Sequence, residues 1–127
     1  FLSIGTRLDE TFKAAKKLSA SGYAVSIADA RFAKPIDKDL VIELANNNNN
    51  LLVIEEASTG GFSSTVISYL SNSEVSNPNL KIKSLTMPDY FIEHKSQEEQ
   101  IAQAGLDAES IFQKSLNFLK HNKIKVI

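Results

Sequence analysis

The segment "IEEASTGGFSS", residues 54–64, contains the residues whose types and spacing could support chemistry. Glu55 and Glu56 follow an apolar run, and Gly60 and Gly61 come just before a stretch with helical periodicity. Two carboxylates can act as a general acid and a general base when their surroundings drive their pKa values apart. A glycine-rich turn before a helix can instead present backbone N–H groups to a phosphate. The two negative charges oppose an anion here, so the segment alone establishes neither function.

Glu55 and Glu56 are better explained as structural carboxylates. Consecutive residues of a strand point to opposite faces, so the two side chains would not meet one substrate. A guanidinium can bind a carboxylate bidentately, and we expect Arg31, at the end of a neighbouring strand, to pair with one of them. Gly60 and Gly61 most often mark a turn with positive φ or a close backbone contact, with an anion site as the less frequent alternative.

The remaining nucleophiles and metal ligands form no catalytic pattern. The chain has no cysteine and only two histidines, His94 and His121, which lack the spacing of metal ligands. The serines after Glu56 lack both the Gly-x-Ser-x-Gly elbow and an obvious base. A single histidine is usually structural, although His94 is a candidate for an acid, a base or an interface contact. We therefore assign no catalytic, cofactor-binding or metal-binding residue.

The composition indicates one globular domain. The chain has 127 residues, 43% hydrophobic and 23% charged, with a net charge of −1. A domain of this size buries roughly two-thirds of the surface that its unfolded chain exposes. The charges are scattered and form no basic surface for nucleic acid, so we expect no nucleic-acid partner. No apolar run reaches the roughly eighteen residues of a membrane helix, so we expect no contact with a membrane. The first residues lie inside a strand-like run without an initiator Met, and we expect a fragment of a longer protein.

Short apolar runs alternate with helical periods along the chain. The runs have the length of strands and cover residues 1–4, 23–28, 51–54 and 80–85. Apolar periodicity predicts one helix after each of the first three runs, the second capped by Asp37, and two helices after the fourth, the first with a capping box at Ser96 and Glu99. The five asparagines at residues 46–50 predict an exposed loop. The order predicts an α/β fold with an open, mainly parallel sheet and helices on both faces.

Functional groups in such a sheet collect in the loops past the carboxyl ends of the strands. Here these loops are residues 5–7, 29–31, 55–61 and 87–89. The last one leads from Asp89 into Tyr90, Phe91 and Ile92, which are more hydrophobic than a solvent loop requires. We expect at least one of these aromatic side chains to face a partner surface, with packing beneath the two C-terminal helices as the alternative.

Three segments together resemble one family: "DARFAKPID" (residues 29–37), "IEEASTGGFSS" (54–64) and "PDYFIEHKSQEEQIAQAGLDAESI" (88–111). They are similar to the C-terminal domain of the 1-deoxy-D-xylulose-5-phosphate synthases, in the transketolase-like, thiamine-diphosphate-dependent family. The third segment is the most specific, whereas the first two also resemble the matching domain of the β subunits of 2-oxo-acid dehydrogenases. The sequence departs from the family pattern at Ser63 and Lys95, where glycine is common.

The resemblance implies that residues 1–127 are a single transketolase-type C-terminal domain of a homodimeric synthase. Such a synthase joins pyruvate to glyceraldehyde 3-phosphate with loss of carbon dioxide, in the non-mevalonate isoprenoid pathway. The resemblance places thiamine diphosphate and Mg²⁺ in two preceding domains of the full-length parent, so the 127-residue chain should bind neither and be inactive. Its implied role is to support packing on those domains and dimerisation.

Two further expectations concern alternatives and location. The chain could instead be a β-subunit domain of a 2-oxo-acid dehydrogenase, or a regulatory domain that binds a phosphate or nucleotide at residues 60–64. The Lys- and Asn-rich composition suits a bacterium, with a cytoplasmic location, and a plastid-bearing eukaryote, with a plastid location, alike.

Overall fold

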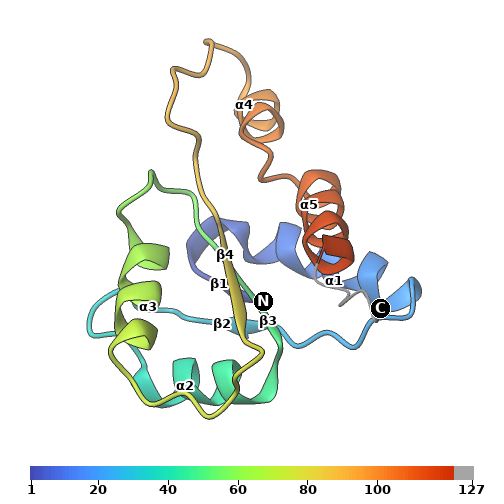
Figure 1. Cartoon of the computed structure of the whole chain (residues 1–127). Coiled ribbons are helices and arrows are strands. Elements are labelled where there is room, and N and C mark those ends of the chain that lie inside the picture. The colour runs from blue at the N-terminus through green and yellow to red at the C-terminus, as the bar shows by residue number, and fades with distance from the viewer. Residues whose placement is uncertain (122–127) are drawn as a thin grey trace.

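The computed structural model describes residues 1–121 as strands and helices that alternate around one sheet (Figure 1). The strands are β1 (Leu2–Ser3), β2 (Ala28–Asp29), β3 (Asn50–Ile54) and β4 (Lys81–Leu85). The helices are the short 3-10 turn η1 (Gly5–Arg7) and α1 (Leu8–Ala20), α2 (Lys38–Asn47), α3 (Phe62–Ser71), α4 (Gln97–Ala104) and α5 (Ala108–His121). No helix in this part of the chain is long and apolar enough to cross a bilayer.

The sheet has the strand order β2-β1-β3-β4, and its neighbouring strands are parallel. Leu2 of β1 is opposite Ala28 of β2 on one side and Val53 of β3 on the other. The chain therefore runs from β1 outward to the edge strand β2 and then returns across β1 to β3. This arrangement confirms the predicted α/β fold with an open parallel sheet.

Helices cover both faces of the sheet, and alternate residues of β3 point to each face. Leu52 and Ile54 pack with α1, α4 and α5 in what we call the first core, whereas Leu51 and Val53 pack with α2 and α3 in the second core. Figure 1 shows α1 and α5 side by side, across the sheet from α2 and α3. The near-continuous apolar run of β3 thus reflects a strand that is buried on both faces.

Local capping signals place the helix ends as predicted. Asp37 accepts a hydrogen bond from the Leu40 N–H at 3.0 Å and caps α2. Ser96 and Glu99 form the capping box of α4, which ends at Gly105 with φ 71°. These short-range hydrogen bonds satisfy N–H groups that the first turn of a helix leaves without partners.

The asparagine run is not the exposed loop that its composition predicts. The helix α2 continues to Asn47 and β3 begins at Asn50. The Asn46 side chain accepts hydrogen bonds from the Ser76 N–H and hydroxyl at 2.9 and 3.0 Å. The Asn77 side chain donates in turn to the carbonyl of Asn48 at 3.0 Å. The prediction failed because Asn side chains here bind backbone groups of a segment distant in sequence, rather than water.

The second strand is also shorter than predicted. Only Ala28 and Asp29 form β2, although residues 23–28 have the pattern of a strand. The inner neighbour β1 begins at Leu2, which is opposite Ala28, so most of the predicted strand has no β1 residue beside it. Val25 and Ile27 nevertheless pack against the first core, which explains the apolar pattern.

Candidate functional site

The carboxyl ends of the four parallel strands meet along one edge of the sheet, as the sequence predicts. The loops that begin there are η1 after β1, residues 30–37 after β2, residues 55–61 after β3 and residues 86–96 after β4. In Figure 1 the last of these loops projects beyond the sheet toward α4. We call this row of loops the carboxyl edge and take it as the candidate functional site.

Glu55 lies at the end of β3 with its carboxylate buried at the start of α3. The residue is 3% exposed. One carboxylate oxygen accepts from the Phe62 N–H at 2.8 Å, and the other accepts from the Ser63 N–H at 2.8 Å and the Ser63 hydroxyl at 2.7 Å. These N–H groups belong to the first turn of α3, where a helix binds an anion. The anion at this helix terminus is therefore a side chain of the protein itself.

The two glycines shape the turn that brings Glu55 and α3 together. Gly60 has φ 103°, a conformation that L side chains rarely adopt. A Cβ at Gly61 would lie 2.6 Å from a Glu55 carboxylate oxygen, so the backbone approaches the carboxylate more closely than any other residue would allow. The predicted turn with positive φ and close contact is confirmed. A phosphate at residues 60–64 is disfavoured, because Glu55 occupies the N–H groups and repels a second anion.

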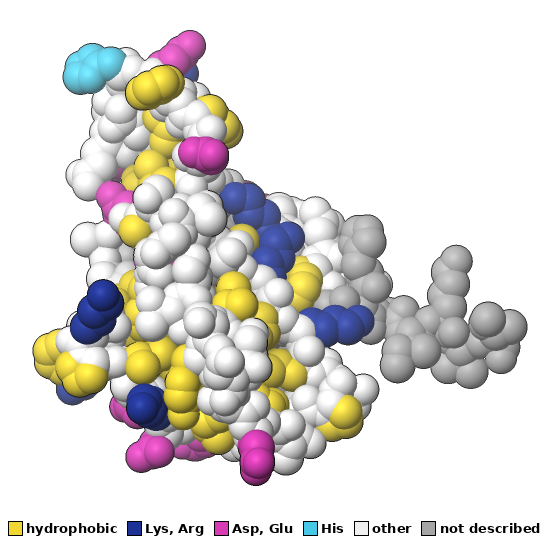
Figure 2. Space-filling view, turned by 60° about the vertical axis from the view of Figure 1, so that its left-hand side comes forward, with side chains coloured by type: hydrophobic (Ala, Val, Ile, Leu, Met, Phe, Trp, Pro, Cys, Tyr) yellow, Lys and Arg dark blue, Asp and Glu magenta, His cyan; other side chains and the backbone are white. Residues whose placement is uncertain are grey.

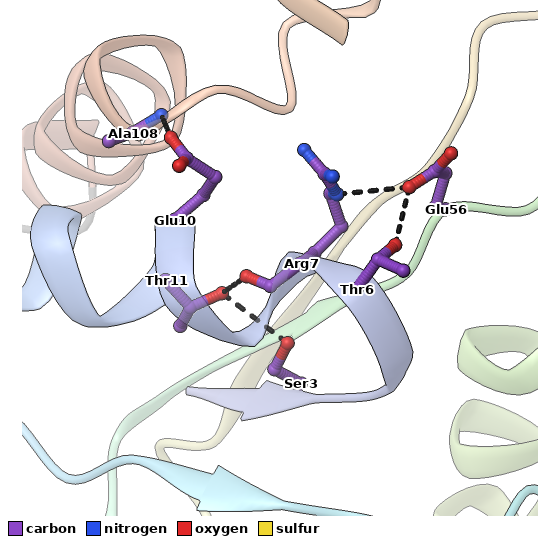
Figure 3. Close-up of polar contacts among 7 residues, drawn as sticks. All are labelled: Ser3, Thr6, Arg7, Glu10, Thr11, Glu56 and Ala108. Atoms are coloured by element: carbon purple, nitrogen blue, oxygen red, sulfur yellow. Dashed lines mark hydrogen bonds and ion pairs between the residues drawn. The ribbon is translucent and has the colours of Figure 1, made fainter. Parts of the chain in front are cut away.

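Glu56 contacts the loop that follows β1 (Figure 3), whereas Glu55 binds the start of α3. Its carboxylate accepts a hydrogen bond from the Thr6 hydroxyl and forms an ion pair with Arg7, whose Nε lies 3.1 Å from the same oxygen. The Arg7 side chain is only 11% exposed, and that of Glu56 is 31% exposed. Water therefore screens this pair less than it screens a surface salt bridge. The two glutamates have separate structural partners and no shared substrate position.

The predicted ion pair between Arg31 and these glutamates is wrong. Arg31 is exposed, and its backbone adopts φ 56°, with its N–H donating to the Asp29 carboxylate at 3.0 Å. The prediction assumed that β2 and β3 are neighbours, but β1 lies between them. The residues that follow β1 are therefore closer to Glu56, and Arg7 takes the role expected of Arg31.

Figure 3 also shows separate polar contacts that Thr11 and Glu10 make near the start of α1. The buried Thr11 hydroxyl donates to the Arg7 carbonyl at 2.8 Å. The residue before Thr11, Glu10, accepts a hydrogen bond through its carboxylate from the Ala108 N–H at 2.8 Å, at the start of α5. The sequence analysis missed Arg7, Glu10 and Thr11, because their hydrogen-bond and ion-pair partners are determined by tertiary packing. The sequence feature that could have indicated the ion pair was an Arg in the loop that follows the first strand.

Tyr90 and Phe91 are exposed, unlike their neighbour Ile92. Tyr90 is 58% exposed, and Phe91 is 102% exposed, which means that the protein leaves its side chain uncovered. Ile92 packs against the first core. Asp89 and His94 are exposed as well. Figure 2 shows hydrophobic, acidic and histidine side chains together on the projecting end of the molecule.

The carboxyl edge has no group of metal ligands among the described residues. No group of three or more His, Asp or Glu residues among positions 1–121 is placed to bind a metal ion. A hollow of about 400 Å³ at the carboxyl edge is lined by residues 4–6 and 55–57. The two carboxylates among them have the structural partners described above. The arrangement can bind loops together, and it offers no paired acid and base.

Comparison with known proteins agrees with this architecture. Residues 1–111 match the family described as transketolase, C-terminal domain. A solved structure titled "Split gene transketolase, inactive beta4 tetramer" is similar, with a TM-score of 0.78 and 28% sequence identity. The similarity covers 91% of this chain and 38% of that one, so this chain spans less than half of that protein's length. Since the family match extends over most of the sequence, the chain belongs to the transketolase C-terminal domain family.

Proposed function

We propose that this chain is the C-terminal domain of a longer thiamine-diphosphate-dependent enzyme, and that it supports the packing of the catalytic domains without contributing reacting groups. The family match over residues 1–111 carries this proposal. The similar transketolase chain is more than twice as long, which supports a parent with further domains. The structural roles of Glu55 and Glu56 support an accessory role, because both carboxylates are engaged within the fold.

The finer proposal is a parent that condenses pyruvate with glyceraldehyde 3-phosphate to form 1-deoxy-D-xylulose 5-phosphate. The resemblance of residues 88–111 to that synthase family favours this reaction over the alternative, a β subunit of a 2-oxo-acid dehydrogenase. With this assignment, we propose a homodimeric parent in the bacterial cytoplasm or in a plastid. The test is an assay of the full-length parent with pyruvate and glyceraldehyde 3-phosphate. Carbon dioxide and deoxyxylulose phosphate in equal amounts are expected, and turnover only with a lipoyl acceptor would favour the alternative.

Residues 1–121, which the structure describes, do not fit a site for thiamine diphosphate. A diphosphate with its Mg²⁺ needs oxygen ligands and free N–H donors, and the described residues bring no group of metal ligands together. The first turn of α3 is already bound to Glu55. When bound elsewhere in a parent, the cofactor supplies carbanion stabilisation, whereas the residues of this chain position and cover the domains beside it.

The first prediction is that the isolated 127-residue chain does not bind thiamine diphosphate. We expect no saturable heat in a calorimetric titration with thiamine diphosphate and Mg²⁺, because the carboxylates of the carboxyl edge repel a diphosphate and occupy its N–H donors. The full-length parent is the positive control. Saturable binding that requires Mg²⁺ in the isolated chain would contradict the accessory role.

The second prediction concerns Phe91 as a contact with the catalytic domains or the second subunit. An uncovered aromatic side chain is typical of an interface anchor, and truncating such anchors weakens association by about 2 kcal/mol or more. Phe91→Ala in the full-length parent should therefore raise the dissociation constant of the dimer at least tenfold, measured by analytical ultracentrifugation, or lower activity where Phe91 contacts the catalytic domains. In the isolated domain the same change should leave stability within about 0.5 kcal/mol.

Phe12→Ala is the control, because Phe12 on α1 is another phenylalanine with an exposed side chain, although it is only half-exposed. It should leave association and activity unchanged. If Phe91→Ala leaves both at the parent's level, Phe91 is not an interface residue. Ile92→Ala, which removes a contact with the first core, should instead destabilise the isolated domain.

A further inference from the structure

A hollow of about 320 Å³ lies beside Arg7, next to the carboxyl edge. Its walls come from η1, α1, α4 and the residue before α5, and they are formed by Arg7, Glu10, Gln97, Glu98, Ile101 and Asp107. Pockets that bind small molecules have volumes from roughly 300 Å³ upward. The hollow, which we call the Arg7 hollow, is therefore large enough for a small molecule, and its walls are mostly polar.

The Arg7 guanidinium has donors that the fold leaves unused. The Arg7 side chain is 11% exposed, and its Nε lies 3.1 Å from a Glu56 oxygen without a directed hydrogen bond. Figure 3 shows the two outer nitrogens pointing away from Glu56, toward the side where Glu10 and Ala108 lie. No residue among positions 1–121 accepts a hydrogen bond from these nitrogens. A guanidinium fork of this kind binds a planar carboxylate through two parallel hydrogen bonds.

The other charged walls of the Arg7 hollow are acidic and have unused acceptors. The Asp107 Oδ1 is buried and accepts no hydrogen bond from the described residues. Glu98 is exposed and has no ion-pair partner in this part of the chain. By contrast, both oxygens of Glu10 are engaged, because one accepts from Lys13 and the other from the Ala108 N–H. The free acceptors therefore lie at the starts of α4 and α5.

The charges on these walls do not cancel. The ion pair described above balances Arg7, and Lys13 balances Glu10. Lys114 attracts Asp107, but its ammonium donates to a backbone carbonyl at 2.8 Å and does not line the hollow. The carboxylates at the starts of α4 and α5 therefore leave an excess of negative charge, beside a guanidinium that still lacks an acceptor.

We propose that the Arg7 hollow binds a free basic α-amino acid, such as L-arginine. The ligand's carboxylate accepts from the Arg7 fork, its α-ammonium donates to Asp107, and its side-chain cation pairs with Glu98. A simple anion would be repelled by the two carboxylates, and a simple cation would leave Arg7 without an acceptor. The inference goes beyond the proposed function and does not depend on the reaction that the parent catalyses.

The test is a calorimetric titration of the 127-residue chain with L-arginine, agmatine and L-citrulline. Agmatine lacks the carboxylate of arginine, and citrulline has a neutral side chain of nearly the same shape. L-Arginine should bind saturably, and agmatine should bind about tenfold more weakly or worse, because it loses the contact with the guanidinium. Citrulline should bind about threefold more weakly, since an exposed ion pair contributes less. The full-length parent should bind L-arginine with the affinity of the isolated chain.

Four variants assign the contacts. Arg7→Gln should weaken the binding of L-arginine about tenfold or more without weakening that of agmatine, a difference that a loss of folding would not produce. Asp107→Asn should weaken the binding of both ligands, and Glu98→Gln, at an exposed position, should remove the preference for arginine over citrulline. Arg31→Gln is the matched control, because Arg31 is the other arginine of the chain and is exposed. It should leave every affinity unchanged.

Three outcomes would overturn the proposal. A titration with L-arginine that gives no saturable heat would show that water alone fills the hollow. Equal affinities for arginine and agmatine in the unmodified chain would show that Arg7 binds no carboxylate. A parent that does not bind L-arginine would show that another domain fills the hollow. The enzyme assay is independent of these titrations, so a failure of the Arg7 hollow and a failure of the proposed reaction are distinguishable.

Discussion

Replacing Glu55 by alanine should destabilise the isolated domain by roughly 3–4 kcal/mol. The carboxylate accepts from the Phe62 and Ser63 N–H groups and from the Ser63 hydroxyl, all of them buried. Each buried donor left without a partner costs about 1–3 kcal/mol, partly offset where water enters the space that the side chain leaves. The loss of the negative charge at the first turn of α3 adds to the effect. Urea unfolding followed by circular dichroism measures the change.

Two further variants test whether the loss of stability comes from the contact between Glu55 and the first turn of α3. Glu55→Gln retains the shape but one of its two oxygens becomes a donor, so it should lose about half as much stability as Glu55→Ala. Gly61→Ala places a Cβ against the carboxylate, at 2.6 Å, and should cost roughly 1–3 kcal/mol in the wild type but less beside Glu55→Ala. A loss below 1 kcal/mol for Glu55→Ala would show that water replaces the carboxylate without penalty.

Stability of the chain that starts at Phe1 should rise with pH between about 6 and 8. Burial lowers the pKa of the terminal amine from 8.0 to about 6. The unfolded chain therefore binds more protons than the folded chain in this range, which makes the free energy of unfolding increase with pH. The contribution is fully present above pH 8.0 and is lost as the pH falls through about 6. A shift of this size corresponds to about 2–3 kcal/mol.

Acetylation of the terminal amine separates this contribution from that of every other titrating group. The acetylated chain should be at least as stable at pH 6 as the free chain is at pH 8, and the difference between the two chains should be small at the higher pH. Unfolding curves in urea at four pH values between 5.5 and 8.5 provide the measurement. Parallel pH profiles for the two chains would mean that water reaches the amine in the folded state.

Much of the fold follows from local patterns in the sequence. The period of apolar residues identified the alternation of strands and helices, and short-range signals at Asp37, Ser96 and Gly105 located helix ends. These features depend on residues a few positions apart, so the sequence contains the needed information. The asparagine run misled the prediction, because its partners Ser76 and Asn77 are about thirty residues away.

The candidate site was predicted less completely, because its contacts depend on strand order. The carboxyl ends and the Gly60–Gly61 turn were located correctly, but the pairing partner of Glu56 was not. Parallel strands can be arranged in several orders with the same sequence pattern, and only the order β2-β1-β3-β4 brings Arg7 rather than Arg31 beside Glu56. Exposure of Phe91 was likewise not decided by the sequence, since a hydrophobic loop can be buried or exposed.

The carboxylate at the start of α3 also affects how this fold can diverge. A descendant that gained phosphate binding at this helix would first have to lose Glu55, and that loss would weaken the whole domain before any ligand compensated for it. The loop at residues 86–96 has no such constraint at Phe91, whose side chain none of residues 1–121 covers. New recognition can therefore evolve at the projecting loop by single substitutions, whereas at the helix terminus it requires a compensating mutation elsewhere.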